Sequence, residues 1–193
     1  MNPEKFISYL KAHGGLPKTL ESDLLNRCEH FSVAERTVII EPGHLSKYIH
    51  FVNEGLFRTF RKNEGLEETM AFTGPNQFIG TGQGFQDSKF NEIGVICHAK
   101  GNGVKIRQLD WQLLCDENSM FLELSRNLLH QRMIKFESES IIYRTGETEH
   151  KVDQLTGLHP GIMEVVARKH IGSFFGVTEQ AISNLICLKK KRS

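Results

Sequence analysis

The chain has 193 residues, of which 39% are hydrophobic and 24% are charged, and its formal net charge is +1. These values are ordinary for a globular protein and allow a real hydrophobic core in one or two domains. No segment approaches the roughly 18 uninterrupted apolar residues that a membrane span needs, and the N-terminus lacks the basic and then apolar pattern of a secretory signal. The composition therefore excludes a membrane-spanning protein and predicts a cytoplasmic one.

The first half of the chain shows two successive patterns. Residues 3–28 have leucines at helical spacing, and Pro17 suits an early turn of a helix. From about Phe31 to Arg107, apolar runs alternate with glycine turns about every 8–12 residues, which predicts an antiparallel sandwich or barrel-like roll. The expected strands are Thr37–Ile40, Tyr48–Val52, Leu56–Arg61, Glu67–Phe72, Ile93–Ala99 and Gly103–Arg107, with turns at Pro42-Gly43, Asn53-Glu-Gly55, Asn63-Glu-Gly65 and Gly74-Pro75.

A long helix is expected from about Ser119 to Arg144, after a short helical segment at Asp110–Cys115. It carries two apolar stripes. One comprises Leu122, Leu129, Met133, Phe136 and Tyr143, and the other comprises Phe121, Leu124 and Leu128. Two stripes predict two partners, the roll on one side and a second chain in a homodimer on the other. The alternative is a single broad core face.

The last part of the chain has the pattern of a helix-turn-helix. Gly146–Gly161 is expected to be a loop or hinge, with at most a short helix at Lys151–Leu155. In the segment that follows, Gly176 permits the left-handed backbone of a tight turn, and Thr178 suits the N-cap of a second helix. The expected buried positions are Ile171 and Phe175 on the first helix and Ile182, Leu185 and Ile186 on the second, with Gly172 small where the helices cross.

The near-neutral total conceals an uneven charge distribution. Residues 168–193 contain six Lys or Arg and one acid, Glu179, for a net charge of +5, while residues 1–167 carry 18 Lys or Arg and 22 Asp or Glu, for a net charge of −4. A basic end on an acidic body is expected of a module that binds a polyanion. We interpret the helix pair and its basic end together as a DNA-binding element. The alternative is a solvated helix pair with an inert tail.

Four motifs resemble the Crp/Fnr family of bacterial transcription regulators, and the similarity covers nearly the whole chain. They are Val38-Ile-Ile-Glu-Pro-Gly43, Tyr48-Ile-His-Phe-Val-Asn-Glu-Gly-Leu-Phe-Arg58, Phe78-Ile-Gly80 and Lys169-His-Ile-Gly-Ser-Phe-Phe-Gly-Val-Thr-Glu-Gln-Ala-Ile-Ser183. The second motif is the most specific. The resemblance implies a cyclic-nucleotide-binding-like roll, a dimerising long helix and a C-terminal DNA-binding domain.

The expected fold is therefore α+β. N-terminal helices precede an antiparallel β-roll of the double-stranded β-helix or jelly-roll kind, and a long dimerisation helix leads to a helix-turn-helix without a C-terminal wing. The expected domains are a sensor roll at residues 1–118, the dimerisation helix at residues 119–145 and the DNA-binding domain at residues 146–193.

The second helix of the pair supplies the candidate base-reading residues, which are Thr178, Glu179, Gln180, Ser183 and Asn184. The candidate phosphate contacts are Arg168, Lys169, Lys189, Lys190, Lys191 and Arg192. Many relatives have an arginine at the position of Asn184, so this chain lacks one strong phosphate or guanine contact. We expect it to act as a regulator with duplex DNA as its partner, and RNA polymerase is a further candidate partner.

The resemblance places an effector pocket at Phe78, Gly80, Thr81, Gly82 and Gln83. Relatives that bind a cyclic nucleotide hold the ribose with an acid and the phosphate with an arginine. Here Thr81 stands at the acid position, and Asn91-Glu92 stands where the arginine is expected. A carboxylate beside a buried phosphate costs energy. We therefore expect no response to cyclic AMP and no cofactor, and the roll binds either another small molecule or nothing.

Other classes of function have less support in the sequence. Gly80-Thr-Gly-Gln-Gly84 lacks the spacing and the βαβ context of a dinucleotide-binding loop. His44 and His50 are too far apart for a cupin metal site, and Cys28, Cys97, Cys115 and Cys187 are scattered, so we expect no metal and reduced cysteines. The chain is therefore not expected to be an enzyme. A small-molecule sensor or interaction protein with a degenerate DNA-binding domain is the alternative, and a cupin-like metalloenzyme is the third.

Overall fold

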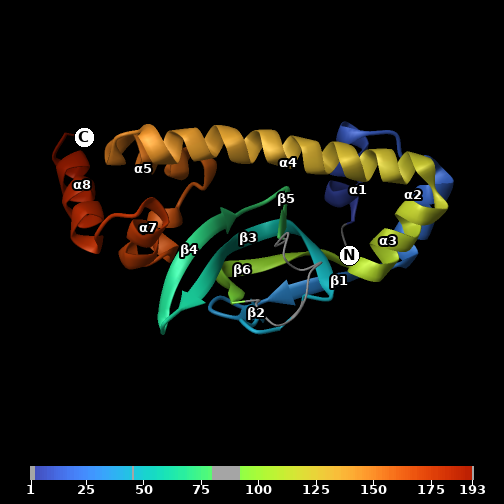
Figure 1. Cartoon of the computed structure of the whole chain (residues 1–193), viewed down its shortest axis with the longest axis horizontal. Helices are drawn as coiled ribbons and strands as arrows, with labels where there is room; N and C mark the ends of the chain where they lie inside the picture. Colours follow the sequence, from blue (N-terminus) through green and yellow to red (C-terminus); the bar gives the residue numbers. More distant parts are fainter. Residues whose placement is uncertain (1–2, 45, 80–91, 193) are drawn as a thin grey trace.

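The computed structural model describes residues 3–44, 46–79 and 92–192, with the backbone alone at residues 142 and 190–192. Four of the predicted effector-pocket residues, Gly80, Thr81, Gly82 and Gln83, lie outside the described residues. Figure 1 shows one long helix, α4, lying along the length of the molecule above a rolled sheet. Helices α1, α2 and α3 gather at one end of α4, and α5, α7 and α8 gather at the other.

The helices and strands follow the predicted order. The N-terminal helices are α1 (Glu4–His13) and α2 (Lys18–Asn26), and the strands are β1 (Cys28–Val33), β2 (Val38–Ile40), β3 (Tyr48–Asn63), β4 (Leu66–Thr73), β5 (Gln77–Ile79) and β6 (Ile93–Arg107). The later helices are α3 (Gln108–Glu117), α4 (Ser119–Thr145), α5 (Thr148–Leu158), α6 (Ile162–Val165), α7 (Arg168–Phe175) and α8 (Glu179–Arg192). The α+β class with an antiparallel roll is confirmed.

The sheet is antiparallel, with the strand order β1-β6-β3-β4, while β2 pairs with β6 and β5 pairs with β3. It closes around an apolar interior to which five strands contribute side chains. These residues are Phe31, Ile40, Val52, Phe57, Ile79, Val95 and Cys97. Strand β1 pairs with β6 on one side of the central β6–β3 pair, and β5 pairs with β3 on the other. Because both β1 and β5 bury residues in this one cluster, the sheet is rolled rather than flat.

One predicted turn, Asn53-Glu-Gly55, and one predicted break between strands, after Ala99, are wrong. The runs Tyr48–Val52 and Leu56–Arg61 form one continuous strand, β3, and the runs Ile93–Ala99 and Gly103–Arg107 form another, β6. The register of the β3–β6 pair shifts around Glu54, and Gly55 has a φ of 103°. Gly55 therefore marks a bulge that bends a strand, where the sequence suggested a turn that ends one.

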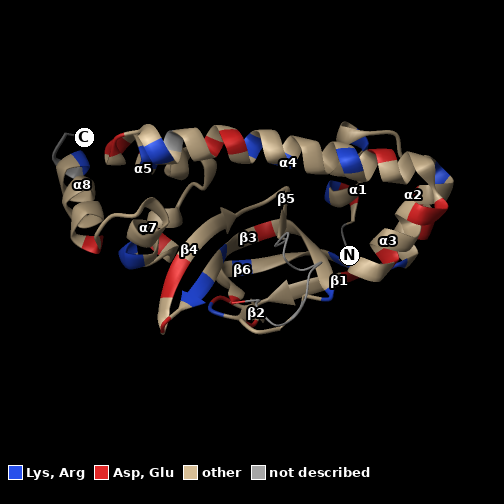
Figure 2. Ribbon diagram, in the orientation of Figure 1, with Lys and Arg blue, Asp and Glu red and all other residues tan. Residues whose placement is uncertain are grey.

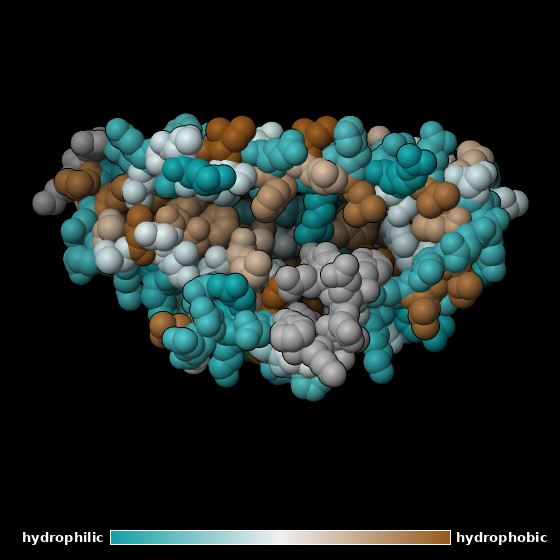
Figure 3. All heavy atoms as spheres, in the orientation of Figure 1, coloured by the Kyte–Doolittle hydropathy of each residue, from teal (hydrophilic) through white to brown (hydrophobic). Residues whose placement is uncertain are grey.

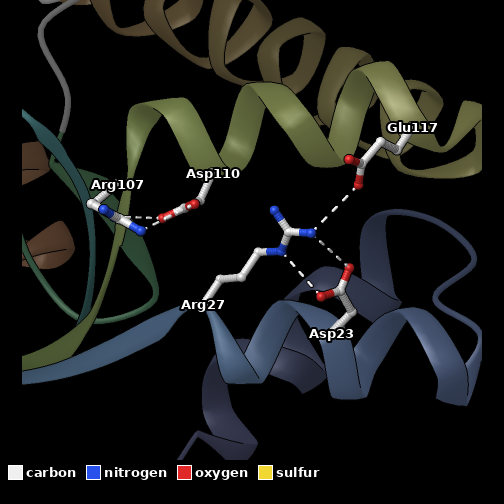
Figure 4. A network of polar contacts seen from close by, with 5 residues as sticks. All are labelled: Asp23, Arg27, Arg107, Asp110 and Glu117. Atoms are coloured by element: carbon white, nitrogen blue, oxygen red, sulfur yellow. Dashed lines mark hydrogen bonds and ion pairs between the residues drawn. The ribbon is translucent and has the colours of Figure 1, made fainter.

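The N-terminal helices and α3 pack with one face of α4. The second apolar stripe of α4, Phe121, Leu124 and Leu128, is buried in this cluster, as predicted. A polar network ties α2 to α3 on the outside of the cluster (Figure 4). Arg27, the C-cap residue of α2, donates to Asp23 at 3.1 Å and reaches Glu117 of α3 at 3.4 Å.

The segment Gly146–Gly161, predicted as a loop with at most a short helix at Lys151–Leu155, is more helical than expected, because most of it forms α5. Val152 and Leu155 are buried there in the core of the C-terminal helices. The burial of this apolar face stabilises the helix despite Gly157 in its last turn. The hinge that remains between α4 and α5 is Gly146-Glu147.

The helix-turn-helix forms as predicted, with α7 and α8 bent by 107°. Gly176 has a φ of 69°, and Thr178 Oγ1 accepts the backbone N–H of Ala181 at 3.2 Å. A Cβ on Gly172 would lie 2.7 Å from the carbonyl oxygen of Val177. The absence of a side chain at Gly172 therefore allows the backbone of the turn to pack against α7. Within the described residues, no single helix is long and apolar enough to cross a membrane, although the bent pair α7 and α8 passes that test when taken together.

Candidate nucleic-acid interface

Helix α8 has one buried face and one exposed face. Ile182 is fully buried against the core of the C-terminal helices, and Leu185 and Ile186 pack beside it. Of the predicted base-reading residues, Thr178, Glu179, Gln180 and Asn184 are exposed, and Ser183 is partly exposed. The structure therefore brings these five residues together on the solvent side of one helix.

Two hydrogen bonds organise this polar face. The Gln180 side-chain amide donates to Oδ1 of Asn184 at 2.8 Å, one helical turn away. Arg168, at the start of α7, donates from Nη1 to Oγ of Ser183 at 3.2 Å. A cation from the first helix therefore lies beside the exposed face of the second.

The remaining basic residues occupy both edges of the helix pair. Figure 2 shows Lys and Arg at the start of α7 and at the end of α8, with an acidic residue at the start of α8. Lys169 is exposed, whereas Lys189 is half-buried and forms an ion pair with Asp153 of α5. The segment Lys189–Arg192, expected to follow the helix as a tail, continues α8. A phosphate contact by Lys189 would thus replace an existing ion pair.

The first apolar stripe of α4 is exposed along most of its length. Phe136 is 70% exposed, Leu129 62%, Met133 61% and Leu122 44%. Figure 3 shows separate hydrophobic groups among hydrophilic ones along the upper edge of the molecule, where α4 lies. Exposed apolar side chains at this density on one helix are typical of a surface that another protein covers.

Tyr143 does not belong to this exposed stripe. Its ring lies 4.9 Å from that of Phe174 and 5.5 Å from that of Phe175, so it packs on the helix-turn-helix of its own chain. Burial, together with the nearby Glu139, raises the pKa of Tyr143 to about 12. Tyr143 continues the seven-residue spacing of Leu122, Leu129 and Phe136, but in the last turns of α4 this side of the helix faces the core of the C-terminal helices.

The one effector-pocket residue that is described, Phe78, lies in an aromatic cluster under α4. Its ring is 5.2 Å from Phe51 and 6.1 Å from Trp111. Arg132 of α4 donates to the Phe78 backbone carbonyl at 3.2 Å. The long helix therefore contacts the roll at Phe78, the described residue of the predicted pocket. Within the described residues, no group of His, Cys, Asp or Glu is arranged to hold a metal ion.

Comparison with known proteins identifies the fold. No family model matches the chain, and no curated protein matches it in sequence. Among solved structures, FixK2 from Bradyrhizobium japonicum superposes with a TM-score of 0.66 at 13% identity, covering 86% of this chain and 85% of that chain. The global regulator CLP from Xanthomonas campestris, described as responsive to c-di-GMP, has a TM-score of 0.63 at 13% identity, with coverages of 89% and 91%.

A third structure carries the family name. A protein from Eubacterium rectale assigned to the Crp/Fnr family of transcriptional regulators superposes with a TM-score of 0.67 at 11% identity, covering 92% of this chain and 85% of that chain. The match spans the roll, the long helix and the C-terminal helices in one alignment. The chain therefore has the fold of the Crp/Fnr transcription regulators.

Proposed function

We propose that this protein is a transcription regulator that binds duplex DNA as a homodimer through α7 and α8. The observation that carries the proposal is the exposed polar face of α8, backed by the buried Ile182 and flanked by the cations Arg168 and Lys169. A helix of this kind fits the major groove, where base edges present hydrogen-bond donors and acceptors.

The exposed stripe of α4 is the proposed dimer surface. Leu122, Leu129, Met133 and Phe136 recur along one side of a helix of 27 residues. Pairing two such helices would bury the stripes against each other and place one recognition helix on each side of a two-fold axis. Half-sites about 34 Å apart, one turn of DNA, suit such a dimer.

Base reading is proposed for the exposed face of α8. An amide side chain pairs with adenine through the N6 donor and the N7 acceptor, and a carboxylate accepts from cytosine N4. Gln180 therefore suits adenine and Glu179 suits cytosine. Thr178, Ser183 and Asn184 complete the contact surface. Because Gln180 and Asn184 share a hydrogen bond, their side chains approach the groove as a pair.

Phosphate binding is proposed for the two basic edges. Arg168 and Lys169 lie at one edge, and Lys189, Lys190, Lys191 and Arg192 lie at the other. These contacts are not sequence-specific, and they would set the salt dependence of binding. Thr81 and Asn91-Glu92 leave the cyclic-nucleotide positions without the family's acid and arginine, so we also propose that the protein does not respond to cyclic AMP.

Selection of bound sites from random duplex DNA tests the proposal. The wild-type protein should enrich a palindromic site, and Gln180→Ala should lower affinity for it by about 1–3 kcal/mol while relaxing one base position in each half-site. Gln112→Ala, at an exposed glutamine on α3 at the other end of α4, is the control and should select the wild-type site. Failure of the wild-type protein to enrich any duplex would favour the degenerate DNA-binding domain instead.

A further inference from the structure

The helix-turn-helix packs directly on the edge strand β4 of its own roll (Figure 1). The backbone N–H of Thr69 in β4 donates to Oγ of Ser173 in α7 at 3.0 Å. The ring of Phe72 in β4 meets that of Phe174 in α7 edge-on at 5.2 Å. Leu56 and Phe72 of the roll are buried in the same cluster as the helix-turn-helix core. The two parts of the chain therefore share a hydrophobic core and a hydrogen bond across it.

A buried arginine lies beneath this contact. Arg58 of β3 is only 1% exposed, and its Nη2 donates to Oε2 of Glu67 at 2.5 Å. Its Nη1 reaches Oγ1 of Thr69 at 3.4 Å. Partial burial alone would raise the pKa of Glu67, but the Arg58 hydrogen bond and charge lower it, so Glu67 is held in its ionised form. Thr69 is thus held on its side chain by Arg58 and on its backbone by Ser173.

His98 of β6 extends the contact to α6. Its Nε2 accepts from Nε of Arg58 at 3.2 Å, and the backbone of Val165 acts on the ring by favouring its protonated form. Because one ring nitrogen accepts, the ring must be neutral in this arrangement. The ring of His170 in α7 lies 6.0 Å from that of His98. We refer to this set as the β4–α7 seam, formed by Arg58, Glu67, Thr69, Phe72, His98, Val165, His170, Ser173 and Phe174.

We propose that the β4–α7 seam positions the helix-turn-helix relative to the roll and so fixes the separation of the two recognition helices in the dimer. The only covalent link from α4 to the C-terminal helices is Gly146-Glu147, and a glycine link by itself leaves the angle between them open. The seam adds two direct contacts, the Thr69–Ser173 hydrogen bond and the Phe72–Phe174 ring contact, and it places the His98 ring 6.0 Å from that of His170. Ser173 and His98 are positioning residues, and the seam is the route by which a change in the roll reaches α8.

Ser173→Ala tests this inference, which rests on the proposed DNA binding. The variant removes the acceptor for the Thr69 N–H, a loss that corresponds to roughly a 5- to 100-fold change in an equilibrium constant. Its affinity for a single half-site should stay within about twofold of wild type, while its preference for the selected half-site spacing over one changed by two base pairs should fall at least about fivefold. Ser173→Thr keeps the hydroxyl and should restore the preference. Ser22→Ala, at an exposed helical serine of α2, is the control.

The outcomes separate the two proposals. If the wild-type protein selects no duplex at all, the proposed function fails. If it selects a spaced site and Ser173→Ala keeps the same spacing preference, the function stands and the positioning role is overturned. Amide hydrogen exchange tests the seam without DNA, because exchange at Thr69 should accelerate in Ser173→Ala and recover in Ser173→Thr. An unchanged Thr69 rate also overturns the proposal.

The seam is expected to weaken in acid. Burial, with Arg58, Lys169 and His98 nearby, lowers the pKa of His170 from 6.5 to about 4, although Glu67 opposes the shift. Because the packed state binds fewer protons than the released state between pH 6.5 and 4, packing is strongest above pH 6.5 and is lost as the pH falls through that window.

His98 adds to this effect. Burial and the cations Arg58 and Arg36 lower its pKa, while the Val165 carbonyl and Glu67 oppose the shift. Between pH 6.5 and 5.5 the spacing preference should therefore fall by about fivefold from His170 alone, and His98 should add to this fall. His170→Gln should flatten this profile, and His30→Gln, at an exposed position in β1, should not. A wild-type preference that is constant between pH 7.5 and 5.5 would contradict the expectation.

Discussion

Phe136→Glu is expected to convert the protein into a monomer and to lower its affinity for a two-half-site duplex by at least about a hundredfold, because the second half-site then no longer binds intramolecularly. Phe136 is the most exposed member of the α4 stripe, at 70%. A glutamate there would bring a charge into the apolar contact between the two helices and lose its hydration. The molar mass from sedimentation and the binding isotherm on matched duplexes measure the two effects.

The matched control lies two residues further along the same helix. Ser138 is exposed, and its hydroxyl bonds the Ile134 carbonyl one turn back, so Ser138→Glu adds the same charge away from the stripe. It should leave both the dimer and DNA binding unchanged. Because Phe136 is largely exposed within its own chain, the thermal unfolding of Phe136→Glu separates loss of the dimer from loss of the fold. A Phe136→Glu protein that remains dimeric with unchanged affinity would show that the stripe is not the interface.

The long helix shows what periodicity alone predicts well. A regular apolar pattern over 27 residues gave the limits of α4 within one residue, because burial on one face and exposure on the other both recur at helical spacing. The buried set Phe121, Leu124 and Leu128 was also predicted correctly. Tyr143 fits the same spacing yet packs on Phe174. Spacing along one helix carries no information on where a second hydrophobic core lies.

The β4–α7 seam shows what the sequence could not reveal. Thr69 and Ser173 are 104 residues apart, and neither has a local pattern that links it to the other. Arg58 reads as a polar residue in an alternating strand, yet it is buried because Glu67, Thr69 and His98 surround it. The length of α5 was underestimated for a related reason. Its apolar face is stabilised by distant segments, while its own sequence contains Gly157 and is followed by Pro160.

Gly55 was interpreted as part of a turn, and its replacement is expected to destabilise the fold strongly. The sequence Asn53-Glu-Gly55 looks like a turn because glycine there adopts a positive φ, and it does so at 103°. The strand continues because β3 stays paired with β6 on both sides of this bulge. At the bulge the two backbones lie very close together. A Cβ on Gly55 would lie 2.5 Å from Cα of Gly101 and 3.0 Å from the carbonyl oxygen of Ala99. The residue therefore needs both an unusual torsion and the absence of a side chain.

Gly55→Ala is accordingly expected to lower the free energy of unfolding by roughly 3–5 kcal/mol, of which about 1–2 kcal/mol comes from the positive φ and the rest from the clash with backbone atoms. Gly43→Ala is the matched control, because Gly43 has a φ of 88° but nothing within 4 Å of its Cβ position. It should lose only about 1–2 kcal/mol. Urea unfolding of the two variants beside wild type measures the difference. Equal losses would show that the torsion alone demands glycine at this bulge, and that the close approach of β3 to β6 relaxes at no cost.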